Sequence, residues 1–177
     1  MSNFYTALKW ILPLGTPVVL ILFYRTAPLV GEGSLDGLMK FNLAAAVMGL
    51  VCLIAFIVSV KSSKGSGVEL STADKGANGM LIAMALICLE LGIFGMVGVN
   101  MDKNADPKVA SMKNCYVQET GFVNHLRGID SILVCTDPSG SETIFALDKE
   151  TAEKLGTEKQ NLTIEYHGNS NRIIRIS

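Results

Sequence analysis

The sequence predicts an α-helical membrane domain with three transmembrane helices, followed by a small β-rich soluble domain. Long apolar segments are confined to residues 1–100, whereas residues 101–177 hold nine Lys/Arg and eleven Asp/Glu, a net charge of 9 − 11 = −2. The later part also alternates apolar and polar residues between turn signals, as half-buried strands do. We expect a membrane domain at 1–100, a linker at 101–112 and a soluble domain at 113–177.

Three segments have the length and composition of membrane spans, at about residues 10–30, 41–60 and 79–100. A membrane helix needs about 20 apolar residues. The second and third segments meet this alone, and the first meets it if Arg25 lies at the interface. A cleaved signal peptide is disfavoured for the first segment, because Arg25 and not a small-residue cleavage motif follows its apolar run.

A soluble helical bundle is the alternative to a membrane domain. Helices of a soluble bundle carry a polar outer face. Residues Ala44–Ile57 and Met80–Leu89 are apolar all round, which favours lipid. Pro13 and Pro17 suit a kinked membrane helix.

The charges that flank the spans leave the orientation nearly balanced. A short N-terminus favours its cytoplasmic placement, which puts the C-terminal domain outside the cytoplasm, and we expect the membrane to be a bacterial inner membrane. The basic residues on the N-terminal side are Lys9, Lys61, Lys64 and Lys75, and those on the other side are Arg25, Lys40, Lys103, Lys108 and Lys113.

The cysteines of the soluble part do not predict a disulfide by simple strand pairing. A hairpin with Asn124 opposite Ser131 places Cys135 opposite Thr120 and far from Cys115. A β-bulge or closure of a barrel would change this register. We therefore leave the oxidation state of both thiols open.

The soluble domain shows the element order β-β-β-α-β-β. Asp148 is a good N-cap for the helix and Gly156 a good C′ residue, and Pro138 and Gly140 suit a turn at 137–142. The expected strands are 115–124, 131–136, 143–147, 161–167 and 172–177, with the helix at 148–156.

This order resembles the OB-fold, a five-stranded Greek-key barrel, over residues 113–177. An SH3-like barrel or an α+β unit would give the same order. The resemblance implies a binding module, and many such barrels bind nucleic acid through a basic face with exposed aromatic residues. The domain lacks a basic face, and Phe122, Phe145 and Tyr166 fall at positions that alternation predicts as core. We expect no nucleic acid, and a protein partner for residues 113–177.

Motifs for catalysis, cofactors or metals are absent from the sequence. The glycine-rich segments 31–37 and 65–67 lack the strand–loop–helix context of a phosphate site. His125 and His167 lie near turns without further ligands at zinc-site spacing. We expect a protein that is not an enzyme and that has no cofactor and no metal.

Small residues in the second and third spans indicate close helix packing, either within the chain or in a homo-oligomer. Cys52 and Cys88 lie in the same spans and are expected to be small apolar packing residues. The candidate helix-packing residues are Ala45, Gly49, Gly79, Ala83, Gly92, Gly95 and Gly98.

Glu90 lies near the middle of the third span, about 16 Å along the helix from Gly79. A lone carboxylate there is costly. It is protonated and hydrogen-bonded to a carbonyl, paired with Arg25, part of a ring in an oligomer, or paired with a cation of a partner. The helical neighbours of Glu90 are apolar, which argues against a continuous wet path.

The sequence thus favours a non-catalytic integral membrane protein, an oligomeric subunit or sensor of a membrane complex whose β domain binds a partner. A proton- or ion-coupled membrane protein centred on Glu90 is one alternative. A small accessory or immunity-type inhibitor of another membrane protein is a second.

Overall fold

The computed structural model describes residues 2–66, 71–126 and 129–177. The chain forms two compact units, each made from separate stretches of sequence. The helical unit comprises residues 1–20 and 41–95, and the sheet unit comprises residues 21–40 and 96–177.

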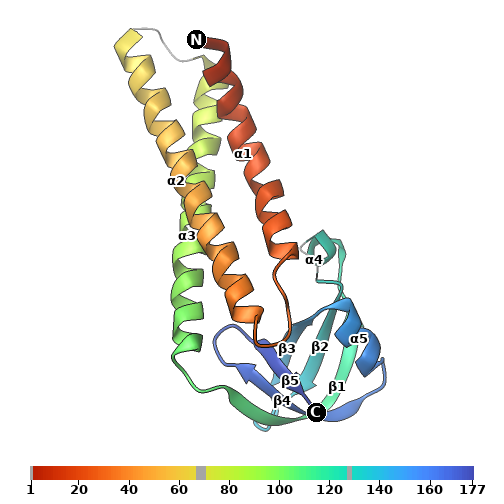
Figure 1. The fold of residues 1–177 in the computed structure, drawn as a ribbon. Helices are drawn as coiled ribbons and strands as arrows, with labels where there is room; N and C mark the ends of the chain where they lie inside the picture. Colours follow the sequence, from red (N-terminus) through yellow and green to blue (C-terminus); the bar gives the residue numbers. More distant parts are fainter. Residues whose placement is uncertain (1, 67–70, 127–128) are drawn as a thin grey trace. The chain divides into compact units, whose positions relative to one another are not determined.

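Three long helices dominate the first hundred residues (Figure 1). They are α1 (Ser2–Arg25), α2 (Ser34–Ser66) and α3 (Thr72–Lys103). Each is long and apolar enough to cross a membrane, so the prediction of three long apolar helices is confirmed. Helix α1 ends at Arg25 and does not continue to residue 30. Pro28 explains the early end, because it disfavours helical geometry at the residue before it.

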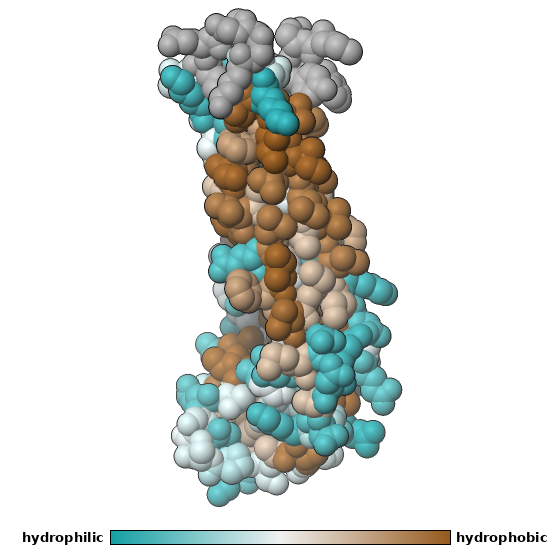
Figure 2. All heavy atoms as spheres, turned by 90° about the vertical axis from the view of Figure 1, so that its left-hand side faces the viewer, coloured by the Kyte–Doolittle hydropathy of each residue, from teal (hydrophilic) through white to brown (hydrophobic). Residues whose placement is uncertain are grey.

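Small and apolar side chains form the core of the helical unit. One cluster joins Leu20, Ala45 and Cys88, and another joins Cys52 with Leu81 and further residues of α3. Cys52 and Cys88 are fully buried, which confirms their expected role as packing residues. Large apolar side chains cover the outside of the unit, as the hydrophobic surface in Figure 2 shows. This arrangement suits lipid and not water.

The sheet unit contains one five-stranded antiparallel sheet that curls into a half-barrel (Figure 1). The strand order is β3-β2-β1-β4-β5. The predicted combination of helices and sheet is confirmed. The strands are β1 (Lys108–Glu119), β2 (Ser131–Thr136), β3 (Glu142–Leu147), β4 (Gln160–His167) and β5 (Arg172–Ile176), with the short helices α4 (Phe122–Leu126) and α5 (Lys149–Leu155) between strands.

Strand β1 begins in the stretch 101–112 that the sequence suggests as a linker. Residues Lys108–Met112 pair with Leu162–Tyr166 of β4, so this stretch has a structural role that its polar composition hides. The strand then ends at Glu119, earlier than the expected residue 124. Phe122 consequently falls in α4 and is 76% exposed, so its predicted place in the core was wrong.

The rest of the sheet core follows the predicted alternation. Phe145 is fully buried and meets the ring of Tyr166 edge-to-face at 5.2 Å. Leu133, Leu147 and Ile164 are also fully buried. These side chains come from β2, β3 and β4 and belong to one buried core cluster of the sheet unit.

The predicted ends of α5 are confirmed. The Asp148 carboxylate accepts a hydrogen bond of 2.8 Å from the Thr151 amide, and the Gly156 amide donates to the Ala152 carbonyl. Asp148 thereby satisfies one of the free N–H groups that begin every helix. Gly156 has φ +70°, a conformation that favours glycine.

The predicted turn between β2 and β3 is also confirmed. The Asp137 carboxylate accepts hydrogen bonds from the Ser139 hydroxyl and from the amides of Ser139 and Ser141. These bonds, led by that of the Ser139 hydroxyl, hold the pKa of Asp137 below its ordinary value. Gly140 adopts φ +88°, the conformational freedom that the turn requires.

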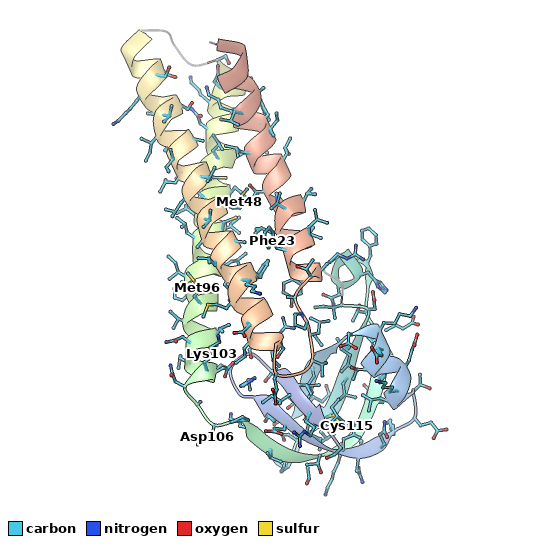
Figure 3. All side chains as sticks on the ribbon, viewed as in Figure 1. Phe23, Met48, Met96, Lys103, Asp106 and Cys115 are labelled. Carbon is cyan, nitrogen blue, oxygen red and sulfur yellow. A yellow bond between two sulfur atoms is a disulfide. The ribbon has the colours of Figure 1, made fainter. Side chains whose placement is uncertain are left out.

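Cys115 and Cys135 form a disulfide, with their Cα atoms 4.1 Å apart. The expected register was wrong, because Glu119 and not Asn124 lies opposite Ser131. From Glu119 to Tyr116 the pairing with β2 is regular, and the same register places Cys115 opposite Cys135. Figure 3 shows Cys115 within the sheet, and both cysteines are buried in its core.

Candidate interaction sites

Glycines bring α2 and α3 into close contact in the helical unit. A Cβ atom added at Gly92 would lie 2.6 Å from the backbone nitrogen of Ala46, and one at Gly49 would lie 2.9 Å from that of Leu89. A Cβ at Gly95 would overlap the side chain of Asn42. Three of the predicted small residues thus serve packing within this chain.

The other predicted small residues have different surroundings. Ala45 is fully buried in the helical core. Gly79 and Gly98 have open space where a Cβ would stand, and Ala83 is exposed. Gly79, Ala83 and Gly98 therefore do not contribute to close helix packing among the described residues.

A groove of about 470 Å³ lies beside the close contact between α2 and α3. We call it the Glu90 groove. Its apolar wall is built mainly from residues of α3, with Phe41 added from α2. The lining residues are Phe41, Asn42, Ile87, Glu90, Leu91, Phe94 and Gly95.

Glu90 is exposed at this groove. Among the described residues it makes no ion pair or hydrogen bond within the helical unit. Glu90 is the one charged residue of the predicted third span, and its exposed carboxylate shares the groove with one other polar side chain, that of Asn42.

Asn42 adds a second unsatisfied polar group to the groove. Its side chain is 3% exposed and packs over Gly95. The Nδ2 atom is buried and has no hydrogen-bond partner among the described residues. Buried polar groups nearly always have hydrogen-bond partners. The helical unit supplies none for this amide, so a partner is expected from outside the unit.

Arg25, the predicted partner of Glu90, ends α1 and belongs to the sheet unit, where its side chain is exposed. Glu90 belongs to the helical unit. Their pairing therefore stays a prediction.

Asp102 organises the end of α3 within the sheet unit, a role that the sequence analysis missed. It is 2% exposed, and its carboxylate accepts hydrogen bonds from the amides of Asn169 and Ser170 and from the Asn169 side chain. The β4–β5 turn is thereby attached to the last turn of α3. An acidic residue after a long apolar helix is the only sequence signal for this role.

Arg172 links β5 to the segment that follows α1. Its guanidinium lies over the ring of Tyr24 at 5.6 Å, donates to the Tyr24 hydroxyl at 3.1 Å, and donates to the Pro28 carbonyl. The Gly31 amide donates to the Ile173 carbonyl at 2.9 Å, beside a parallel bridge between Val30 and Ile173. Residues 24–31 therefore pack along β5 as part of the sheet unit.

Neither histidine lies in a metal-binding arrangement. His125 contacts Asp130 through Nδ1 at 2.7 Å on the surface. His167 lines a separate groove with Glu165 and Asp36, and its buried Nδ1 has no partner among the described residues. Across the part of the chain that the structure describes, no three His, Cys, Asp or Glu side chains are grouped to hold a metal ion.

Comparison of the chain with protein-family models, with curated proteins and with solved structures found no match.

Proposed function

We propose that this chain is a non-catalytic integral membrane protein, a subunit or sensor of a membrane complex whose sheet unit binds a partner. The observation that carries the proposal is the outward-facing carboxylate of Glu90 on an apolar helical surface. A charged group near the bilayer centre costs several kcal/mol unless it is paired or hydrated. Since the helical unit leaves this cost uncompensated, association with another molecule supplies the missing interaction.

We further infer that the sheet unit is an OB-like binding module. Strand β1 pairs with both β2 and β4, and the two edge strands of the curled sheet, β3 and β5, contact each other. Helix α5 follows β3, as expected for a five-stranded Greek-key barrel. Fold alone gives no ligand, but exposed Val109 and Ile144 offer apolar contact area on this unit.

We propose that the N-terminus is cytoplasmic and that the sheet unit lies outside the cytoplasm, in the periplasm of a bacterial host. The disulfide between Cys115 and Cys135 supports this placement. Disulfides persist in oxidising compartments and are rare in the cytosol. The disulfide thus favours one orientation, whereas the nearly balanced charges that flank the helices favour neither.

The composition of the detergent-solubilised particle tests the proposed function. Native mass spectrometry of the full chain, purified from the cells that carry it naturally, is expected to give one defined stoichiometry in which the chain is joined by further copies of itself or by a second protein. The Leu14→Ala variant, which changes an exposed residue of α1 that does not line the Glu90 groove, serves as the control and should give the same stoichiometry. A lone monomer in mild detergent and in native lipid particles would contradict the proposal.

A further inference from the structure

We propose that the Glu90 groove binds a transmembrane helix of a different protein, which places a lysine or arginine side chain against Glu90. This inference rests on the proposed function and names the chemistry of the partner. The groove provides a carboxylate and an unpaired amide on an apolar wall. An apolar helix with one basic residue matches both features.

The helical unit does not supply the cation itself. The predicted second and third spans contain no lysine or arginine. Lys9 of α1 is only 15% exposed and already pairs with Asp74 at 3.0 Å. A cation that pairs with Glu90 must therefore come from outside this unit.

The geometry of α3 also turns Glu90 away from α1. Cys88 of α3 packs in the cluster that contains Leu20 of α1. Glu90 follows two residues later, which is about 200° around the helix. In agreement, every residue that lines the groove comes from α2 or α3.

A second copy of this chain is a poor occupant on grounds of charge. Two copies with the same topology relate by an axis along the membrane normal, so each residue keeps its depth. Two grooves that face each other would then bring Glu90 against Glu90. Like charges at close range in a medium of low dielectric constant repel strongly. Opposite charge on a different chain avoids this conflict.

Asn42 gives the groove a second requirement. Its buried Nδ2 donor is about 7.5 Å from the depth of Glu90, roughly one and a half helical turns, because Asn42 packs over Gly95, five residues further along α3. A hydroxyl or a free carbonyl on the incoming helix would accept from this donor. We therefore expect the partner helix to carry a basic residue and, about one and a half turns away, a serine, a threonine or a helix break.

Site-specific photocrosslinking of the full chain tests the inference. A photoreactive residue replaces Phe94, which lines the groove and is 71% exposed, or Leu14, which is 59% exposed on α1 and lines no part of it. We expect the probe at position 94, and not that at position 14, to capture an apolar segment of about 20 residues with a lysine or arginine. Peptide mass spectrometry identifies the segment.

Charge variants of Glu90 complete the test. Glu90→Gln keeps the size of the side chain and one acceptor oxygen but removes the charge, and should lower the crosslink yield at least about tenfold. Glu90→Asp should retain most of it. An unchanged yield in Glu90→Gln, a captured segment without a basic residue, or a crosslink to a second copy of this chain would each overturn the inference. If a partner still co-purifies in any of these cases, the proposed function stands.

Discussion

The carboxylate of Asp102 accepts hydrogen bonds from both the backbone and the side-chain nitrogen of Asn169, at 2.9 and 3.0 Å. Its second oxygen accepts from the Ser170 amide at 2.8 Å. One buried side chain in the last turn of α3 thus holds the β4–β5 turn. Hydrogen bonds to a charged acceptor are stronger than those between neutral groups.

Replacing Asp102 by alanine should loosen this turn. The substitution removes the charged acceptor of the hydrogen bonds from Asn169 and Ser170, which should reduce the stability of the sheet unit by about 1.5–3 kcal/mol. Hydrogen exchange of the full chain in detergent should show faster exchange at the amides of Asn169 and Ser170. Asp106→Ala, at an exposed site nearby, is the matched control and should leave that exchange unchanged. Unaltered protection in Asp102→Ala would show that the turn does not depend on this carboxylate.

Tyr24→Phe should weaken the contact of Arg172 without abolishing it. The change removes the hydroxyl that accepts from Arg172 and keeps the ring beneath the guanidinium. We expect a loss of about 0.5–1.5 kcal/mol in the protection of β5 amides. Tyr24→Leu should cost more, because the cation–π contact is lost as well.

The control for this prediction is Tyr116→Phe. The Tyr116 hydroxyl makes no hydrogen bond among the described residues, and Lys159 contacts only its ring, at 5.5 Å. Hydrogen exchange at β5 should be unaffected in this variant. Equal effects of Tyr24→Phe and Tyr116→Phe would mean that the Arg172 hydrogen bond contributes nothing to β5.

Local sequence patterns predicted most helices and strands. The strand register and the long-range contacts could not be predicted, because they depend on residues far apart in the chain. Apolar length identified three helices, and Asp148 and Gly156 marked the ends of α5, because these signals act within a few residues. The register of β1 and β2 could not be read in this way, since Phe122–Leu126 form α4 and the pairing begins with Glu119 opposite Ser131. The role of Asp102 depends on a turn 67 residues away in the chain, and no local pattern reports such a contact. Glu90 was recognisable from composition alone, but its outward direction required the packing of Gly92 and Gly95 against α2.

Gly92→Ala and Gly79→Ala should have opposite effects on the helical unit. At Gly92 a Cβ would lie 2.6 Å from the Ala46 backbone nitrogen, so α2 and α3 would have to move apart. At Gly79 the space is open, and alanine favours a helix over glycine by about 1 kcal/mol. Thermal unfolding in detergent, followed by circular dichroism, should show a lower midpoint for Gly92→Ala and an equal or higher one for Gly79→Ala. Similar midpoints for both variants would argue against a close contact of α2 with α3 at Gly92.

The disulfide gives a test of both the sheet and its compartment. In the native chain, denaturation without a reductant should expose only Cys52 and Cys88 to an alkylating reagent, and reduction should add Cys115 and Cys135. Four reactive thiols before reduction would place the sheet unit in a reducing compartment and contradict the proposed orientation. The double substitution of Cys115 and Cys135 by serine should lower stability by about 3 kcal/mol, because the disulfide closes a loop with a sequence separation of 20. The matched double substitution of Cys52 and Cys88 by alanine should leave the disulfide between Cys115 and Cys135 intact. Loss of the disulfide in this variant would mean that its formation depends on the helical unit.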